Sequence, residues 1–189
     1  FDDGPGSNTT TLLNILAQHG IRATMFVTGQ NAASNPSLIQ AIKNGGHWIG
    51  NHSYTHPYLT QMSQAQIQSE LQQTQQAVQN AGGGTPNLFR PPYGATNGTI
   101  RSIAQSLGLT EVLWDVDSQD WNGASTAAIV QAANQLQNGQ VILMHDNGAW
   151  NTNAAIPQIA QSLRNRNMCP GMISPVTGRA VAPDNNDGG

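Results

Sequence analysis

Residues 12–27 read Leu-Leu-Asn-Ile-Leu-Ala-Gln-His-Gly-Ile-Arg-Ala-Thr-Met-Phe-Val, and they are the clearest indication of the fold class. Leu12, Leu13 and Leu16 share one face of a predicted helix, which Gly20 can terminate. The apolar run at 21–27 then predicts a buried strand. A helix that leads directly into a buried strand is the repeating unit of parallel α/β proteins.

The same unit of helix and strand recurs along the rest of the chain. Pro36 suits the first turn of one helix, and Ser63 with Gln66 forms a capping-box pattern for another. Apolar helix stripes are predicted at 38–42, 67–78, 100–107, 129–136 and 156–163, and strands at 48–51, 87–90, 110–116, 140–144 and 172–174. Such alternation implies parallel strands joined by right-handed crossovers.

The first residues complete this count of strands. Residues 1–4 read as the end of a strand that runs into a loop, so the first strand is expected to be truncated. With it there are about seven strand positions, as in an incomplete (β/α) barrel. We therefore predict an α/β fold of this kind, and an open doubly wound sheet is the alternative.

Composition limits the classes of partner. Only 9% of the 189 residues are charged, so the polar surface must come from Gln, Asn, Ser and Thr, which suits neutral, hydroxyl-rich partners such as carbohydrate. A net charge of -3 with 7 Lys and Arg argues against nucleic acid. No apolar run approaches the roughly 20 residues of a membrane span. We expect a protein that binds neither nucleic acid nor membrane, and a monomer.

The chain is expected to hold one domain at 1–181, followed by a tail at 182–189. The tail is rich in Pro, Asn, Asp and Gly, which is typical of a flexible end or the start of a linker. Cys169 cannot form an internal disulfide, because it is the only cysteine. It is either a small buried hydrophobe or half of a disulfide with an upstream partner.

Polar side chains gather where the predicted strands end. They occupy the positions 2–3, 51–56, 90–93, 117–121 and 145–146. In parallel α/β folds the carboxyl ends of the strands hold the active site. This concentration is the strongest indication of function that the residues alone provide.

His52 and His56 stand four residues apart, a spacing that lets two imidazoles bind one metal ion. By itself the pair also fits two surface histidines, and Asp2-Asp3-Gly-Pro also fits an ordinary turn. Taken together, two histidines and one carboxylate leave one tetrahedral position open, as in catalytic zinc sites. Adjacent side chains at a strand end point different ways, so one aspartate can bind metal while its neighbour faces the substrate.

Three further residues fit acid–base chemistry beside such a metal. A free carboxylate can take a proton from water, and an acid on the other side must protonate the leaving group. His145 ends a predicted strand and is placed for the second task, although a core histidine is the alternative. Asp120 could orient His145 and Arg90 could hold Asp2 ionised, or each could form a structural ion pair.

Five segments now carry a family resemblance. In order they are Phe1-Asp-Asp-Gly-Pro, His52-Ser-Tyr-Thr-His56, Arg90-Pro-Pro-Tyr93, Asp117-Ser-Gln-Asp-Trp121 and Leu143-Met-His145. They resemble the five motifs of the NodB-type polysaccharide deacetylases, carbohydrate esterase family 4. The chain looks most similar to actinobacterial acetylxylan esterases and chitooligosaccharide deacetylases. The resemblance implies a distorted seven-stranded (β/α) barrel that normally has a full strand before the first motif.

The resemblance also implies a role for each matching residue. Metal binding falls to Asp3, His52 and His56, with zinc the usual ion, and His₂Asp sites also accept cobalt or nickel. The resemblance makes Asp2 the general base, with Arg90 as its tether. It makes His145 the general acid, with Asp120 as the residue that tunes it.

Substrate contacts are implied for a second group of residues. Tyr93 would contribute its backbone N–H to an oxyanion hole, and the preceding Pro92 belongs to the same substrate-binding segment. Trp121 would line the groove, where an aromatic face can stack on a sugar ring, or it would simply pack in the core.

We therefore expect a secreted, metal-dependent hydrolase that removes acetyl groups from acetylated xylan, chitin-type oligosaccharides or both. A glycosidase that pairs Asp115 or Asp117 with Asp120 is a second hypothesis, although it leaves His52 and His56 without a purpose. A carbohydrate-binding module with an inert site is a third.

Overall fold

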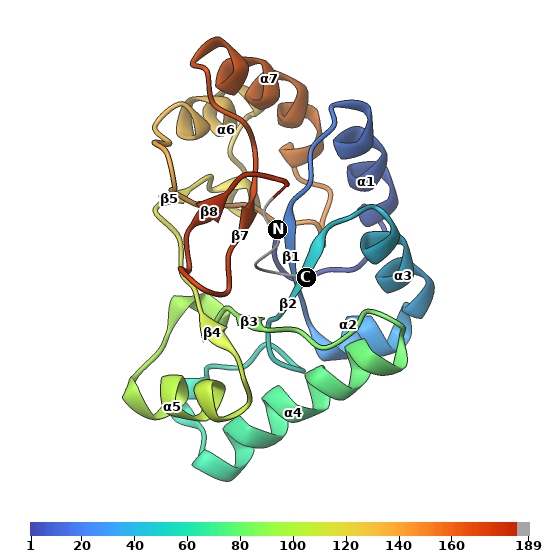
Figure 1. Cartoon of the computed structure of the whole chain (residues 1–189), viewed down its shortest axis with the longest axis vertical. Coiled ribbons are helices and arrows are strands. Elements are labelled where there is room, and N and C mark those ends of the chain that lie inside the picture. The colour runs from blue at the N-terminus through green and yellow to red at the C-terminus, as the bar shows by residue number, and fades with distance from the viewer. Residues whose placement is uncertain (185–189) are drawn as a thin grey trace.

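The computed structural model describes residues 1–184, and its parallel strands lie at the centre with helices around them (Figure 1). A four-stranded sheet holds β1 (Thr24–Val27), β2 (Trp48–Asn51), β3 (Leu88–Phe89) and β4 (Thr110–Glu111) in that order. A second parallel pair consists of β5 (Val116–Asp117) and β6 (Ile142–Leu143). The predicted α/β fold with parallel strands is confirmed.

The first residues of the chain connect these two sheets. Asp2 forms one parallel bridge with Phe26 of β1 and another with His145, which follows β6. Its N–H donates to the Met144 carbonyl at 2.8 Å, and the Phe26 N–H donates to the Phe1 carbonyl at 2.8 Å. The segment predicted as the end of a strand thus lies between β1 and β6.

Seven helices surround the strands in the described part of the chain, and short 3₁₀ turns follow three of the strands. The helices are α1 (Thr9–Gln18), α2 (Gly29–Ser34), α3 (Pro36–Asn44), α4 (Gln64–Asn80), α5 (Gly98–Ser106), α6 (Thr126–Ala133) and α7 (Thr152–Asn165). The turns are η1 (Leu59–Gln61), η2 (Pro92–Gly94) and η3 (Asp120–Asn122). Pro36 begins α3 and the capping box of Ser63 and Gln66 is present, as predicted. The short α2 was not predicted, because it has almost no apolar stripe.

The prediction of one strand at 110–116 was wrong. The chain forms β4, leaves the sheet, and re-enters as β5 beside a different strand. Two side chains hold the intervening backbone away from β3: Arg90 donates to the Leu113 carbonyl, and the Asp115 carboxylate accepts from the Val141 N–H. These polar contacts interrupt the predicted strand, and sequence periodicity cannot foresee them.

The last predicted strand has a different partner from the one expected. β7 (Met172–Ile173) pairs with β8 (Ala180–Val181) in an antiparallel hairpin and adds no parallel strand. Cys169 is exposed and free, so the expectation of a buried hydrophobe was wrong. The tail predicted at 182–189 lies outside the described residues from 185 onward. No helix in the described part of the chain is long and apolar enough to cross a membrane.

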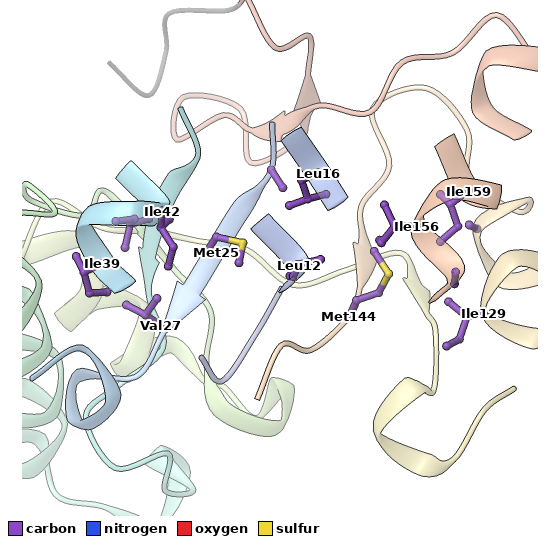
Figure 2. Close-up of a cluster of buried hydrophobic side chains, with 14 of the residues drawn as sticks. Leu12, Leu16, Met25, Val27, Ile39, Ile42, Ile129, Met144, Ile156 and Ile159 are labelled. Carbon is purple, nitrogen blue, oxygen red and sulfur yellow. The ribbon is translucent and has the colours of Figure 1, made fainter. Parts of the chain in front are cut away.

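Both faces of the central strand β1 are buried. Met25 and Val27 point from β1 toward α1 and α3, and the same cluster continues through Met144 to α6 and α7 (Figure 2). The intervening Phe26 points the opposite way and packs with Leu88 and Ile173 of the hairpin. β1 is therefore buried along its whole length, as is usual for a central parallel strand. The polar residues of the predicted site follow the ends of the strands.

Candidate metal and catalytic centre

The polar segments predicted to converge do meet at the carboxyl ends of the strands. Asp2 and Asp3 lie beside β1, and the loop after β2 carries His52 and His56. Arg90 follows β3 directly. The remaining two predicted catalytic residues come from η3 and from the end of β6, namely Asp120 and His145.

Asp3, His52 and His56 form a compact group of potential metal ligands. The Asp3 Oδ1 atom lies 3.0 Å from His52 Nε2 and 3.1 Å from His56 Nε2. One ligand atom from each residue falls within 4.8 Å of the others. Asp3 Oδ1 is buried and has no hydrogen-bond partner among the described residues. Buried polar atoms are normally satisfied, so this oxygen requires a partner.

The tautomer of His52 explains what that partner is. Its Nδ1 lies 2.7 Å from the Arg90 carbonyl, which can only accept, so Nδ1 must carry the proton. In the neutral ring Nε2 then presents a lone pair toward Asp3 Oδ1. Two facing acceptors repel unless a cation lies between them, and an N–H bond to a backbone carbonyl is the usual support for a metal-binding histidine. The donor set fits a divalent metal ion.

The carboxyl groups of Asp2 and Asp3 are held ionised. Burial alone would raise the pKa of Asp3, but His52 and His56 hold it far below its ordinary value. Burial would likewise raise the pKa of Asp2, yet the charge of Arg90 lowers it. Arg90 Nη1 donates to Asp2 Oδ1 at 2.7 Å, and both side chains are buried. An ionised, buried carboxylate beside the triad can accept a proton.

His145 approaches the second carboxylate oxygen of Asp3. Its Nε2 lies 3.9 Å from Asp3 Oδ2, while its Nδ1 lies 2.8 Å from Asp120 Oδ1. Burial alone would lower the pKa of His145, but its hydrogen bond to Asp120 and the charge of Asp120 raise it. The result favours the protonated ring, which can donate from Nε2.

The Asp120 carboxylate is fixed by several donors. It accepts from the backbone N–H of His145 at 2.7 Å and of Trp121 at 2.8 Å, and from the Thr152 hydroxyl at 2.6 Å. Thr152 was not predicted as part of the site. Because all these donors converge on one buried carboxylate, the orientation of the His145 ring is tightly defined.

Backbone strain also concentrates at this edge of the sheet. Six non-glycine residues in the described part of the chain have positive φ, and only Asn167 lies away from the site loops. The others are Asp3, Ser53, His56, Tyr93 and Gln119. Left-handed conformations cost non-glycine residues free energy and cluster at functional sites. One chemical centre therefore accounts for strain in four separate loops.

Two kinds of surface border the centre. Tyr93 and Trp121 are about half exposed, with 54% and 49% of their surface accessible, whereas Pro92 is buried. On another side a cavity of about 250 Å³ is bounded by Asp3 and His56. The rest of its lining is polar, contributed by Thr28, Gln30, Asn31, Tyr54, Thr55 and Asn147.

Sequence analysis missed Glu70, which fixes the loop that carries the histidines. From α4 its carboxylate accepts from the N–H groups of Tyr54 and Thr55 at 2.8 and 2.9 Å, and from the Thr55 hydroxyl at 2.7 Å. One signal was available: Glu70 lies three residues after Ile67, next to the buried stripe of its helix.

The carboxylates proposed for a glycosidase are engaged elsewhere. Asp115 accepts from the Val141 backbone, and Asp117 accepts from the backbone and side chain of Gln119. A larger cavity of about 370 Å³ lies near Phe1 and β7. Its lining is mainly apolar and shares only Arg90 with the residues of the centre. Neither feature competes with the centre as the chemical site.

Fold and site together define an α/β protein with a candidate metal centre at the carboxyl edge of its sheet. The polysaccharide deacetylase family matches residues 1–112. A solved structure of a family 4 carbohydrate esterase from Streptomyces lividans in complex with acetate superimposes with a TM-score of 0.95. The two sequences are 66% identical, and the superposition covers 97% of this chain and 95% of the esterase chain.

Two curated relatives extend the comparison. A bifunctional xylanase/xylan deacetylase of Cellvibrio japonicus is 59% identical over 184 residues, covering 97% of this chain and 28% of that protein. A peptidoglycan-N-acetylglucosamine deacetylase of Listeria monocytogenes is 38% identical over 151 residues, covering 77% of this chain and 31% of that protein. The chain thus spans less than a third of the length of these two relatives.

The chain belongs to the polysaccharide deacetylase family. The resemblance drawn from the five sequence motifs is confirmed.

Proposed function

We propose that this chain removes acetyl groups from a polysaccharide by metal-assisted hydrolysis. The observation that carries the proposal is the buried, unpartnered Asp3 Oδ1 close to His52 Nε2 and His56 Nε2. An ionised Asp2 lies 3.6 Å from His52 Nε2, and His145 lies 3.9 Å from the second oxygen of Asp3. The named activities of the relatives support acetyl removal.

Asp3, His52 and His56 would hold the metal ion. When bound, a divalent metal such as zinc makes a water molecule acidic and polarises an acyl oxygen. Zinc is our proposal for the native ion, and cobalt or nickel also suits this donor set.

The residues of the chain supply the proton transfers. The water oxygen attacks the acetyl carbon, and Asp2 accepts the proton that the water releases. Arg90 keeps Asp2 ionised and fixes its Oδ1, so that Oδ2 is left to face the water. Tyr93 holds a left-handed backbone conformation with φ 62°, and we propose that its N–H stabilises the oxyanion.

His145 completes the reaction. As the bond from the acetyl carbon to the sugar oxygen or nitrogen breaks, the Nε2 proton passes to the leaving group and acetate is released. Asp120 acts through His145, because it binds Nδ1 and so directs the transferable proton to Nε2.

We further propose that the substrate is acetylated xylan, a chitin-type oligosaccharide or both, and that Trp121 helps to form its groove. Pro92 is buried, so its expected substrate contact is not proposed. A polysaccharide such as xylan is too large to cross a membrane, so an enzyme that acts on it must lie outside the cell. This supports our proposal that the protein is secreted. A distorted, incomplete (β/α) barrel is our proposal for the finer architecture, supported by the position of Asp2 between the two parallel sheets and by the apolar cluster inside them.

The decisive experiment measures acetate release from acetylated xylan and from chitohexaose by metal-stripped protein. We expect almost no release without metal and restored release with added zinc, and the two rates rank the substrates. Protein that stays fully active after metal removal would exclude the mechanism. Zinc-loaded protein that binds oligosaccharide but releases no acetate would instead support an inert binding module.

A further inference from the structure

Tyr58 and Tyr93 form an exposed pair of stacked rings at the rim of the centre. Their centroids are 4.0 Å apart and their planes differ by 11°. Even so, 47% and 54% of the two residues remain accessible. The stack covers one face of each ring, so much of the remaining ring surface is open. Contiguous exposed aromatic surface is a feature of binding sites.

The pair is connected to the candidate metal ligands by ring contacts. The Tyr93 ring meets the His56 ring edge to face, with centroids 4.6 Å apart. Tyr58 is therefore the second ring outward from His56. A group bound on Tyr58 would lie beside the reacting acetyl group and not at it.

The backbone on both sides of the stack is well anchored. Tyr58 immediately precedes η1, whose Leu59 is fully buried against α4 and α5. Tyr93 lies in η2, where its positive φ turns the chain sharply after β3. The two rings therefore come from separate, anchored segments and are in place before any ligand arrives. Preorganised aromatic groups bind at low conformational cost.

The chemistry of the surface suits a sugar. An aromatic face packs against the C–H groups of a pyranose ring, and a phenol hydroxyl can exchange hydrogen bonds with sugar hydroxyls. Only 9% of the residues are charged, so binding of a neutral sugar polymer would depend on apolar contacts and hydrogen bonds and not on charge. We propose that Tyr58, stacked on Tyr93, is the subsite for the sugar next to the acetylated one, and that it favours oligomers over single acetylated sugars. This inference rests on the proposed function.

The test compares three variants with the wild-type protein by isothermal titration calorimetry with xylohexaose and with chitohexaose. Tyr58→Ala should weaken binding of at least one oligosaccharide by about tenfold, which corresponds to the loss of one aromatic contact. Tyr58→Phe keeps the ring and should stay within about twofold of the wild type, since the hydroxyl adds at most one exposed hydrogen bond. Gln61→Ala, an exposed change in η1, controls for disturbance of that turn.

Acetate release from partially acetylated xylo-oligosaccharides gives a second readout. Tyr58→Ala should raise KM much more than it lowers kcat, because the ring contacts a neighbouring sugar and not the reacting atoms.

Equal affinity of Tyr58→Ala and the wild type for both hexamers would overturn the inference. If the wild type still released acetate in that case, the proposed function would stand without it. A wild-type protein that neither binds the hexamers nor releases acetate would overturn both.

Discussion

Strand β2 has a histidine at each end, and the two form opposite hydrogen bonds. His47 precedes the strand and His52 follows it, and both are almost fully buried, with 5% and 2% of their surface accessible. His47 Nδ1 accepts from the Ala23 N–H at 3.0 Å. His52 Nδ1 donates to the Arg90 carbonyl at 2.7 Å. The same atom of the same residue type is thus an acceptor at one end and a donor at the other.

The surroundings explain the difference. At the amino end His47 completes the hydrogen bonding of a neighbouring strand, and burial lowers its pKa to about 4, so it stays neutral. At the carboxyl end His52 faces two carboxylates, Asp2 and Asp3. Burial of a histidine therefore says little about function. The group that its second nitrogen faces distinguishes a structural histidine from a metal ligand.

The largest expected effect separates the two histidines directly. His52→Ala should lose both bound metal and acetate release, whereas His47→Ala, its matched control, should retain metal. Metal content is measured after dialysis, alongside acetate release. Metal retained by the His52 variant would remove the basis for treating the two ends of β2 as chemically different.

A second variant tests whether Asp2 is a general base or a metal ligand. Asp2→Asn should retain metal but reduce acetate release by about 10²–10⁴-fold, the usual contribution of a general base. The same two measurements apply. Equal metal loss in the Asp2 and His52 variants would mean that Asp2 is a ligand.

The lowered pKa of His47, at the amino end of β2, should affect how the stability of the protein depends on pH. The folded-state pKa of His47 is about 4, below the ordinary value of 6.5, so the unfolded chain binds the proton more readily. Its contribution to the free energy of unfolding is complete above pH 6.5 and is lost as the pH falls toward 4. The loss is up to about 3 kcal/mol.

Urea unfolding at several pH values, for the wild type and for His47→Asn, measures this contribution as a difference. We expect the wild type to lose stability relative to the variant between pH 6.5 and 4. Parallel curves would show that His47 titrates normally and that the two ends of β2 differ less than their hydrogen bonds indicate.

The smallest expected effect concerns the support of the histidine loop. Glu70→Ala removes three hydrogen bonds to Tyr54 and Thr55 and should weaken zinc binding by about 10–100-fold, as is usual for residues that orient metal ligands. Competition with a chelator measures the affinity. Glu111→Ala, which removes the other glutamate, is the control. Unchanged zinc affinity would confine Glu70 to a role in stability.

The sequence predicted the fold where local signals were strong. The stripe of Leu12 and Leu16, Pro36 and the Ser63 capping box each place a helix that the structure contains. The parallel strands followed from alternation. Prediction failed at 110–116, where side-chain contacts from Arg90 and Asp115 divide the predicted strand into two. Contacts between residues distant in sequence leave no periodic signal.

The residues of the site were likewise predicted where a local motif carries them and missed where it does not. Every residue expected at the centre lies at the carboxyl edge, because motifs after parallel strands must converge there. Glu70 and Thr152 were missed because they come from helices outside the motifs, and Tyr58 because it lies in the loop just after the second motif. Their importance depends on an oriented contact, such as the Thr152 hydroxyl on Asp120, which residue type and spacing do not reveal.

The opposite proton-transfer roles proposed for Asp2 and His145 also determine how the site must recover between turnovers. Each proposed turnover leaves a surplus proton on Asp2 and a deficit on His145, so the site cannot react again until the two are exchanged. No hydrogen bond joins the two side chains in the described residues, and Asp2 is only 3% exposed and bound to Arg90. We therefore expect the surplus proton to leave through solvent once acetate has departed. Product release then comes before Asp2 and His145 return to their starting protonation states.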